Sequence, residues 1–348
     1  MPQLASSNPQ ATAPSYLRDC WYQAAWSSEL DGGMIARTIL DVPVVIFRTS
    51  DGVSALLDRC PHRFAPLSAG RVESGIVTCG YHGLAFDGTG RCHHNPHGPV
   101  TNAMKVQAFP LAERESAIWI WMGDPEKADE ALIPRLDFIG DADESSRIFF
   151  HVPTEANYQL LTDNIMDLSH ADYLHAGTFG ETIVGAKMRV FRRDDAIVAE
   201  WINIGCEAPP FKRKEIPGAH GADFWIEVAW HAPAVMVLRA ATVPTGQQRE
   251  AKDVTTALHN MTPETKHSTH YFACATGSGK REAPEAVAVR RKMLERAFIG
   301  EDKPMVEAQQ ARIGPNDFWS LHPVILKIDS AAVQVRRKLD ELIAAELV

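Results

Sequence analysis

Residues 60–82 read CPHRFAPLSAGRVESGIVTCGYH, in which Cys60-Pro61-His62 is separated by sixteen residues from Cys79-Gly80-Tyr81-His82. Each of these two short motifs offers one thiolate and one imidazole. Two loops of this kind can hold a [2Fe–2S] cluster with both sulfurs on one iron and both nitrogens on the other. Replacing two anionic thiolates by neutral imidazoles reduces the negative charge of such a site and raises its reduction potential. The stretch therefore predicts an iron–sulfur cluster held by two loops.

A structural zinc ion is the alternative use of two cysteines and two histidines. Zinc fingers of that composition usually pair cysteine with cysteine, whereas here each loop supplies one residue of each type. The pattern resembles the Rieske motif, which favours the cluster. Pro61 and Gly80 help to bend the loops, and Gly83 permits close approach of the backbone. Cys92-His93-His94-Asn95-Pro96-His97 lacks a second ligand pair, so we expect loop or packing residues near the cluster.

The residues around these loops favour short β-strands. Residues 38–53 contain two β-rich runs around Ser50-Asp51-Gly52, which is a hairpin signature. Further strands are expected at residues 54–57, 75–79, 84–86 and 117–122. We expect a flexible tail at residues 1–15 and a small antiparallel all-β domain at residues 16–125.

A second stretch, Asn164-Ile165-Met166-Asp167-Leu168-Ser169-His170-Ala171-Asp172-Tyr173-Leu174-His175, places two histidines five residues apart. Two histidines and one carboxylate on one face of a metal form the ligand set of non-haem Fe(II) enzymes that activate oxygen. On an ideal helix His175 would be rotated ~140° from His170. Both histidines can therefore reach one ion only if the helix widens into a π-type turn or breaks.

The carboxylate ligand is not obvious from spacing. Asp163, Asp167 and Asp172 lie close to the two histidines in sequence, and the pair Glu301-Asp302 lies more than a hundred residues further on. Spacing alone favours Asp167 or Asp172 as the third ligand.

Beyond the histidines the pattern alternates between strands and helices. Strands are expected at residues 148–152, 187–191, 196–201, 223–230, 234–239, 255–261 and 268–275, and helices at 282–299 and 332–346. This order predicts an antiparallel sheet flanked by helices, an α+β layout, in a catalytic domain at residues 126–348. In the last helix Arg336 belongs to the polar side of an amphipathic pattern.

The composition argues against several classes of protein. The 348 residues carry a formal net charge of −9, whereas general binders of nucleic acid or anionic membranes are normally basic. No apolar run approaches the ~20 residues that cross a bilayer, and the N-terminus lacks the features of a secretory signal. Six cysteines are too few for a disulfide scaffold, so we expect a cytoplasmic protein. No flavin or nicotinamide motif is complete, so a separate protein must supply electrons.

Together, the two metal motifs resemble those of the Rieske non-haem iron oxygenases. Within this family the chain is similar to the vanillate- and dicamba-type O-demethylase oxygenase components. The similarity covers nearly all of the chain and includes Trp21-Tyr22, residues 60–68, 80–84 and 163–170, Ala208-Pro209-Pro210-Phe211, Glu301-Asp302 and Ile328-Asp329. It implies an N-terminal Rieske [2Fe–2S] domain and a C-terminal catalytic domain of helix-grip fold.

The resemblance also implies roles for individual residues. It makes Asp302 the carboxylate that completes the mononuclear iron site of His170 and His175. It makes Asp167 a catalytic bridge, which hydrogen-bonds His170 and the partner subunit's His82 and carries electrons between the two metal sites. A carboxylate between two imidazoles fixes their orientation. Because the bridge closes between chains, the resemblance implies a head-to-tail homotrimer.

The implied activity is that of the terminal oxygenase of a multicomponent monooxygenase in aromatic compound catabolism. A ferredoxin or a flavin reductase would deliver electrons from NAD(P)H, and O2 would be the co-substrate. Hydroxylation of a methoxy carbon gives a hemiacetal that collapses to a phenol and formaldehyde, so we expect O-demethylation of a methoxylated aromatic acid. N-dealkylation of an aromatic amine or amide and hydroxylation of an aryl methyl group stay open. The mononuclear iron ligands argue against a Rieske electron carrier without catalysis.

Residues for the substrate are harder to assign. By resemblance His259 is a polar substrate contact, and Met261 and Trp230 lie in strands expected to line a pocket, although core packing explains them equally well. Asn164 orients the substrate or supports the ligand helix.

Overall fold

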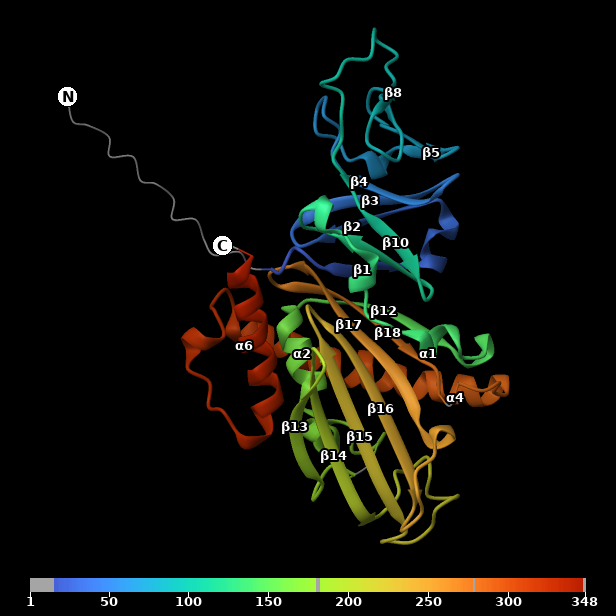
Figure 1. Ribbon diagram of the computed structural model, residues 1–348, viewed down its shortest axis with the longest axis vertical. Helices are drawn as coiled ribbons and strands as arrows, with labels where there is room; N and C mark the ends of the chain where they lie inside the picture. Colours follow the sequence, from blue (N-terminus) through green and yellow to red (C-terminus); the bar gives the residue numbers. More distant parts are fainter. Residues whose placement is uncertain (1–15, 180–181, 278, 347–348) are drawn as a thin grey trace, which may run out of the picture.

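The computed structural model describes residues 16–179, 182–277 and 279–346, so the tail expected at residues 1–15 lies outside the described part. Figure 1 shows an elongated molecule, with small β-sheets at one end and one large sheet with helices at the other. None of the helices in the described ranges combines the length and the apolar character that a membrane span requires. The expected two-part α+β fold is confirmed.

Three small sheets form the N-terminal part. The first has the order β2-β3-β4-β9, the second β5-β6-β7-β8 and the third β1-β11-β10. Their strands are β1 (Trp21–Trp26), β2 (Met34–Ile39), β3 (Val42–Thr49), β4 (Gly52–Leu57), β5 (Arg71–Glu73), β6 (Ile76–Thr78), β7 (Ala85–Phe86), β8 (Cys92–His94), β9 (Ala108–Phe109), β10 (Leu111–Arg114) and β11 (Ala117–Trp121). The first predicted cluster loop follows β4, and the second connects β6 to β7 of the second sheet, which lies at the top of Figure 1.

A tight turn that the sequence pattern did not reveal joins β2 to β3. The hairpin predicted around Ser50–Asp51 connects β3 and β4, but Leu40 and Asp41 form a further turn with φ values of 51° and 64°. Such turns favour Asn, Asp or Gly, and this one has Asp41 but also Leu40, which is rare at a positive φ. The Leu40 and Asp41 N–H groups donate to the carbonyls of Pro263 and Glu264 at 3.0 and 2.9 Å. These bonds to the large sheet offset the unfavourable local conformation and connect the two parts.

The C-terminal part is built on a seven-stranded antiparallel sheet of order β12-β18-β17-β16-β15-β14-β13. Its strands are β12 (Ile148–Thr154), β13 (Lys187–Arg193), β14 (Ala196–Cys206), β15 (Ala222–His231), β16 (Val235–Pro244), β17 (Thr255–Thr265) and β18 (Ser268–Ala275). The helices are α1 (Asp137–Gly140), α2 (Tyr158–Met166), α3 (Ala171–Leu174), α4 (Pro284–Glu295), α5 (Lys303–Ile313) and α6 (Ser330–Ala345). Every strand expected for this part is present.

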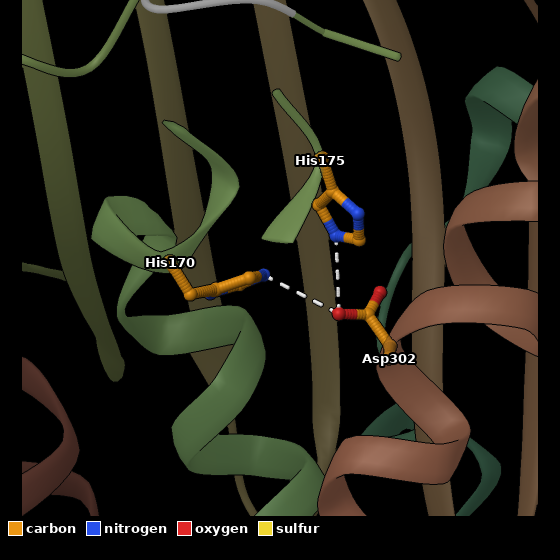
Figure 2. A group of neighbouring side chains, drawn as sticks. All are labelled: His170, His175 and Asp302. Carbon is orange, nitrogen blue, oxygen red and sulfur yellow. Dashed lines mark ion pairs between the residues drawn. The ribbon is translucent and has the colours of Figure 1, made fainter. Parts of the chain in front are cut away.

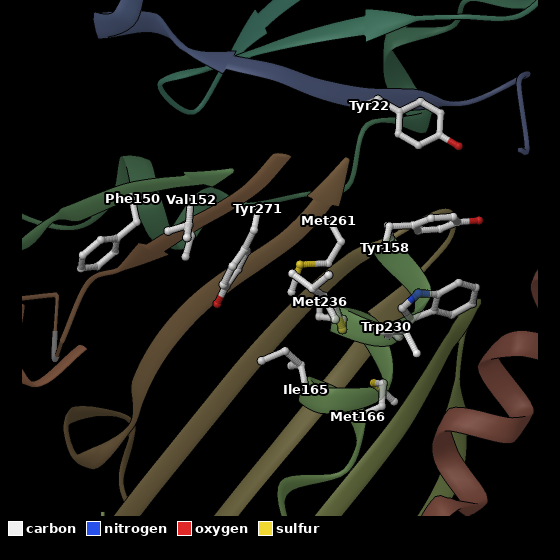
Figure 3. Close-up of a cluster of buried hydrophobic side chains, with 14 of the residues drawn as sticks. Tyr22, Phe150, Val152, Tyr158, Ile165, Met166, Trp230, Met236, Met261 and Tyr271 are labelled. Atoms are coloured by element: carbon white, nitrogen blue, oxygen red, sulfur yellow. The ribbon is translucent and has the colours of Figure 1, made fainter. Parts of the chain in front are cut away.

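The two faces of the large sheet bury different side chains. In β15, Phe224, Val228 and Trp230 point into the main core, whereas Ala229 packs in a separate cluster on the other face, as strand alternation requires. Figure 3 shows Ile165 and Met166 of α2 lying near Met236 and Met261 of the sheet, with Tyr22 of β1 above them. The helix that begins the metal-binding stretch is therefore packed directly on the core.

The N-terminal part shares its core with the catalytic sheet. Trp119 and Phe272 lie in one buried cluster, and burial of large apolar side chains of this kind stabilises a fold by about 1.5–3 kcal/mol each. The Trp26 indole donates to the Phe150 carbonyl at 2.8 Å, and the Thr262 hydroxyl donates to the Gln23 carbonyl at 2.7 Å. Apolar burial and specific hydrogen bonds thus connect the two parts.

The last helix, α6, does more than present an amphipathic face. Arg336 is only 5% exposed, so its assignment to a polar, exposed side was wrong. Its guanidinium donates to both Asp163 oxygens at 2.6–3.0 Å and to Gln159 at 2.6 Å, and it lies over the Phe318 ring. Because Asp163 and Gln159 belong to α2, this buried ion pair fixes the helix that leads into the metal-binding stretch.

Candidate metal centres

The histidine-bearing stretch is broken at Asp167. Helix α2 ends at Met166, and Asp167 has an extended conformation with φ −125° and ψ 93°. The Asp167 carboxylate accepts a hydrogen bond from the Ser169 N–H at 2.9 Å and so begins a 3-10 turn, η6 (Leu168–His170), which leads into α3. The break therefore lies before both histidines and not between them, where it was expected. The single turn α3 joins the two, with His170 at its N-cap and His175 at its C-cap.

The π-helical widening occurs on another element. The segment η8 (Arg296–Asp302) is a π-helix between α4 and α5, and Asp302 is its last residue. The Asp302 Oδ1 atom lies 3.4 Å from His170 Nε2 and 3.1 Å from His175 Nε2, as Figure 2 shows. One ligand atom from each of the three residues lies within 4.8 Å of the others, which is a spacing that one metal ion can bridge.

Each of the two imidazoles is held through its other nitrogen. His170 Nδ1 lies 2.7 Å from the Asp167 carbonyl, and His175 Nδ1 lies 2.7 Å from a carboxylate oxygen of Glu301. The Arg296 guanidinium holds the second oxygen of Glu301 at 2.8 Å. Such contacts leave both Nε2 atoms free to face a metal, which is the usual arrangement for metal-binding histidines. Glu301 was predicted only as the neighbour of Asp302, and its role beside His175 could not be read from the sequence.

The charges at this site suit a cation. Burial alone would raise the pKa of Asp302, but hydrogen bonds and charges from His170 and His175 outweigh it and hold the pKa at about 2. Burial lowers the pKa of His175, but Asp302 and Glu301 reverse this effect and raise it overall. The carboxylate is therefore ionised at neutral pH beside two imidazoles, and these residues fit a mononuclear Fe(II).

The spacing argument for the third ligand does not match the geometry. The Asp172 carboxylate is buried and accepts hydrogen bonds from the N–H groups of Ile183 and Val184. Asp167 contacts His170 through its backbone carbonyl, while its carboxylate binds Ser169. Sequence neighbours are therefore engaged with the backbone, whereas the distant Asp302 reaches the histidines. The link from Asp167 to a neighbouring chain stays a prediction.

A cavity of about 10 Å³, which is room for no more than one water molecule, adjoins Asp302. It is lined by Thr154, Leu161, Asn164, Ile165, Met261, Tyr271, Phe298, Asp302, Lys303 and Val306. The Asn164 amide lies 3.2 Å from Asp302 Oδ1, and Met261 contributes to the wall as predicted. Tyr271 and Phe298 were not predicted, because the sequence does not show which face of β18 or η8 meets the metal site. A larger cavity of about 440 Å³ lies elsewhere, between α2, α5 and α6.

The other two predicted substrate residues are placed differently. His259 is buried and does not line the cavity. Its Nδ1 atom lies 2.6 Å from the Tyr271 hydroxyl, and its ring stands edge to face with Phe298, so it contacts two of the lining residues. Burial lowers the pKa of His259 to about 4, so the imidazole is neutral at pH 7. Trp230 is packed in the core and does not belong to the cavity wall. Its indole N–H has no hydrogen-bond partner among the described residues.

The two predicted cluster loops have the same backbone hydrogen bonds. In the first, the Cys60 N–H donates to the Ala65 carbonyl and the Phe64 N–H donates back to the Cys60 carbonyl. In the second, the Cys79 N–H donates to the Leu84 carbonyl and the Gly83 N–H donates back to the Cys79 carbonyl, with the same sequence separations as in the first loop. The distances are 2.8–3.0 Å in both loops. The fourth residue after each cysteine has a positive φ, 60° at Phe64 and 75° at Gly83. Two matched loops therefore present two matched cysteines.

The four predicted cluster ligands form two neighbouring pairs, the two cysteines and the two histidines, with one member of each pair on each loop. Cys60 and Cys79 are buried, and burial raises the pKa of the Cys60 thiol, with a further increase from the adjacent Cys79 thiol. The rings of His62 and His82 are 4.5 Å apart and stand edge to face. Thiols on the inside and imidazoles toward the surface fit a [2Fe–2S] cluster with one exposed iron.

Comparisons with known proteins place both halves in one family. Residues 20–110 match the Rieske [2Fe-2S] domain, and residues 154–345 match the Vanillate O-demethylase oxygenase C-terminal domain. The chain is 38% identical to the oxygenase component of dicamba O-demethylase from Stenotrophomonas maltophilia, over 94% of this chain and 98% of the relative. It is 36% identical to the oxygenase component of chloroacetanilide N-alkylformylase from Rhizorhabdus wittichii, over 95% and 97%.

A solved structure shows the same fold over nearly the whole chain. Dicamba monooxygenase bound to 3,6-dichlorosalicylic acid superposes with a TM-score of 0.88 at 36% identity, covering 96% of this chain and 99% of that chain. The matched loops, the two histidines and the late aspartate thus occur in a chain whose two halves match those of known oxygenases. The protein belongs to the Rieske non-haem iron oxygenases and is a monooxygenase component of the vanillate O-demethylase type.

Proposed function

We propose that this oxygenase hydroxylates the methoxy carbon of a methoxylated aromatic acid and thereby removes the methyl group as formaldehyde. In this reaction one oxygen atom of O2 enters a C–H bond, and externally supplied electrons and protons reduce the other to water. The resulting hemiacetal breaks its carbon–oxygen bond to give a phenol and formaldehyde. The observation that carries the proposal is the convergence of His170, His175 and Asp302 at a spacing that one metal ion can bridge.

The residues around the site position the reaction. His170, His175 and Asp302 would hold the iron, which supplies the oxygen chemistry when it is bound. Glu301 and the Asp167 carbonyl fix the two imidazoles, as their 2.7 Å contacts indicate. Asn164, whose amide contacts Asp302, would orient the substrate or that carboxylate. Leu161, Ile165, Met261 and Phe298 contribute the apolar part of the wall beside Asp302.

Cys60, His62, Cys79 and His82 would hold the [2Fe–2S] cluster that supplies electrons to the mononuclear site. A ferredoxin or a flavin reductase would reduce this cluster with electrons from NAD(P)H. In Figure 1 the cluster loops lie at the end of the molecule away from α2, so a short path within one chain is not favoured. We therefore propose a head-to-tail homotrimer in which Asp167 connects to the partner subunit's His82.

Exposed apolar side chains support this assembly. Phe64 and Tyr81 on the cluster loops are 70% and 65% exposed, and Tyr173 on α3 is 83% exposed. Large apolar residues exposed at both ends of the proposed bridge are typical of a surface that another protein covers. The proposal divides the chain into a cluster domain at residues 16–125 and a catalytic domain at residues 126–348, and places the system in the cytoplasm.

N-dealkylation is the second candidate function. It is favoured by the 36% identity to the oxygenase component of chloroacetanilide N-alkylformylase. Hydroxylation of an aryl methyl group is a related outcome, because the chain is also 30% identical to the iron-sulfur subunit TsaM1 of the toluene-4-sulfonate monooxygenase system of Comamonas testosteroni.

The test is turnover of a panel of methoxy-, N-alkyl- and methyl-substituted aromatic compounds with a surrogate reductase. We expect formaldehyde and matching O2 uptake from methoxylated aromatic acids, and lower rates from the uncharged methoxy analogues. Formaldehyde from N-alkyl compounds alone would select the second candidate. An Asp302→Ala variant, assayed in parallel, controls for O2 consumed by the cluster and reductase without substrate oxidation.

A further inference from the structure

A third loop, at residues 95–99, lies against the second cluster loop. The Nε2 atom of His97 is 3.0 Å from the backbone carbonyl oxygen of His82. A carbonyl oxygen can only accept a hydrogen bond, so His97 must carry a proton on Nε2 and donate it. The contact therefore fixes the backbone at the very residue whose imidazole is to face the iron of the cluster.

The third loop is itself held in shape. The Asn95 carboxamide oxygen accepts from the His97 N–H at 3.0 Å, and its NH2 group donates to the Pro99 carbonyl at 3.1 Å. One asparagine thus closes the loop on both sides and orients the His97 backbone, as Asn commonly does in turns. The backbone that carries the His97 imidazole is therefore held in place beside His82.

Packing brings the two loops into close contact. A Cβ atom built on Gly83 would lie 3.2 Å from Pro96 Cγ, which is tighter than ordinary packing allows. Gly83 also has a φ of +75°, which favours glycine. The absence of a side chain at Gly83 therefore lets Pro96 approach and brings His97 within reach of His82.

The first cluster loop is braced in another way. Asp58 accepts from the Ser68 N–H at 2.7 Å and from its hydroxyl at 2.5 Å, which closes the ends of that loop. Residues 92–97 contain two more histidines, His93 and His94, on the exposed strand β8. Neither has a side-chain hydrogen bond to a cluster loop within the part of the chain that the structure describes.

We propose that His97 is a positioning residue for the cluster, which locks the His82 backbone and so fixes the orientation of the His82 imidazole. This inference rests on the assignment of His82 as a cluster ligand. His97 does not touch the iron or the sulfurs in this arrangement. It acts through His82, in the way that outer hydrogen bonds orient metal ligands. The otherwise unused Asn95-Pro96-His97 segment then has a role in the electron-transfer site.

The test compares His97→Ala, His97→Gln and His94→Ala in the full-length protein purified with its cluster. Without a substrate or a reductase, we would measure the electron paramagnetic resonance spectrum of the dithionite-reduced cluster and the rate of iron release to a chelator. His97→Ala should shift the g values and release the cluster iron about fivefold faster, the effect expected for loss of one hydrogen bond. Gln places an N–H near the position of Nε2, so His97→Gln should restore most of both properties.

His94→Ala is the matched control, because it removes a nearby exposed histidine without touching His82, and it should resemble the wild type. Asn95→Ala should change the spectrum in the same direction as His97→Ala but less. Wild-type spectra and release rates for His97→Ala, or equal changes for His94→Ala, would overturn the proposal. These measurements need no turnover, so they fail independently of the formaldehyde assay.

Discussion

The two metal sites of this chain are assembled in different ways. The cluster site takes its four predicted ligands from two short loops with identical hydrogen-bond patterns within residues 60–84. The mononuclear site would take two ligands from the segment after α2 and the third from a π-helix more than a hundred residues later. A site on neighbouring loops can be recognised from its motif alone, whereas a site between distant elements depends on the packing of the whole domain.

The two sites also differ in how far their histidines are exposed to solvent. The cluster histidines stand near the surface, beside exposed Phe64 and Tyr81. In the catalytic half, His175 is buried, and Glu301 and Asp302 compensate for its burial. The cluster must meet partner proteins, while the mononuclear iron must exclude water from its substrate. Loss of one site should therefore leave the other assembled.

The largest effect is expected from Cys79→Ala. Loss of one thiolate should remove the cluster and abolish turnover with any protein donor, because the site needs both cysteines. The mononuclear iron should stay bound, since none of its three ligands lies in the cluster part. Visible absorption and iron content per chain check this result. Loss of all iron would show that the sites depend on each other.

A smaller effect is expected from Glu301→Gln. The neutral amide is a weaker partner for His175 Nδ1, so turnover or iron affinity should fall about 10–100-fold. The cluster spectrum should not change. Glu307→Gln is the control, because Glu307 lies on the next helix and bonds Lys303 rather than a histidine. Equal losses in both variants would mean that Glu301 acts only through helix stability.

Because Phe64 and Gly83 occupy equivalent positions in the two loops, substitutions at both positions test whether the loops have the same backbone requirement. Gly83→Ala should destabilise the N-terminal part by about 1–2 kcal/mol, because alanine is strained at a φ of +75° and its Cβ would approach Pro96. Phe64→Gly, at the equivalent position with a φ of 60°, should be neutral or stabilising. Denaturant midpoints of the two variants provide the comparison. Similar destabilisation by both would contradict the equivalence of the loops.

The smallest effect concerns pH. Burial, with nearby His151 and Arg37, lowers the pKa of His270 to about 4, from the 6.5 expected in the unfolded chain. Between these values the unfolded chain binds the proton more readily, so stability should fall as the pH drops from 6.5 toward 4. One such histidine contributes about 1 kcal/mol of loss by pH 5.5. His270→Gln should flatten this dependence in urea titrations, and an unchanged slope would count against a neutral buried His270.

The sequence was informative where local chemistry decides the structure. The two Cys-x-His and Cys-x-x-His motifs and the alternating strands predicted the fold class and the cluster loops. Rotation about a helix axis indicated that one ideal helix could not serve both His170 and His175. The break itself lies at Asp167, before both histidines. Each of these features depends on residues that are close together in the chain.

Features that depend on packing could not be read from the pattern. Spacing favoured Asp167 or Asp172, but the structure uses Asp172 to bind the backbone of residues 183 and 184. The Leu40–Asp41 turn is stabilised by the neighbouring sheet rather than by its own residues. Arg336 looked exposed by periodicity and is buried against Asp163. In each case the deciding partner is distant in sequence.

The central claim is that Asp302 completes an iron site that is separate from the cluster. The most direct measurement is the iron content and cluster spectrum of Asp302→Ala, with Asp172→Asn as the comparison. We expect Asp302→Ala to keep the cluster's two irons and its spectrum while losing the remaining iron and all substrate oxidation. If Asp302→Ala kept the third iron and its turnover, while Asp172→Asn lost them, the ligand assignment would be contradicted.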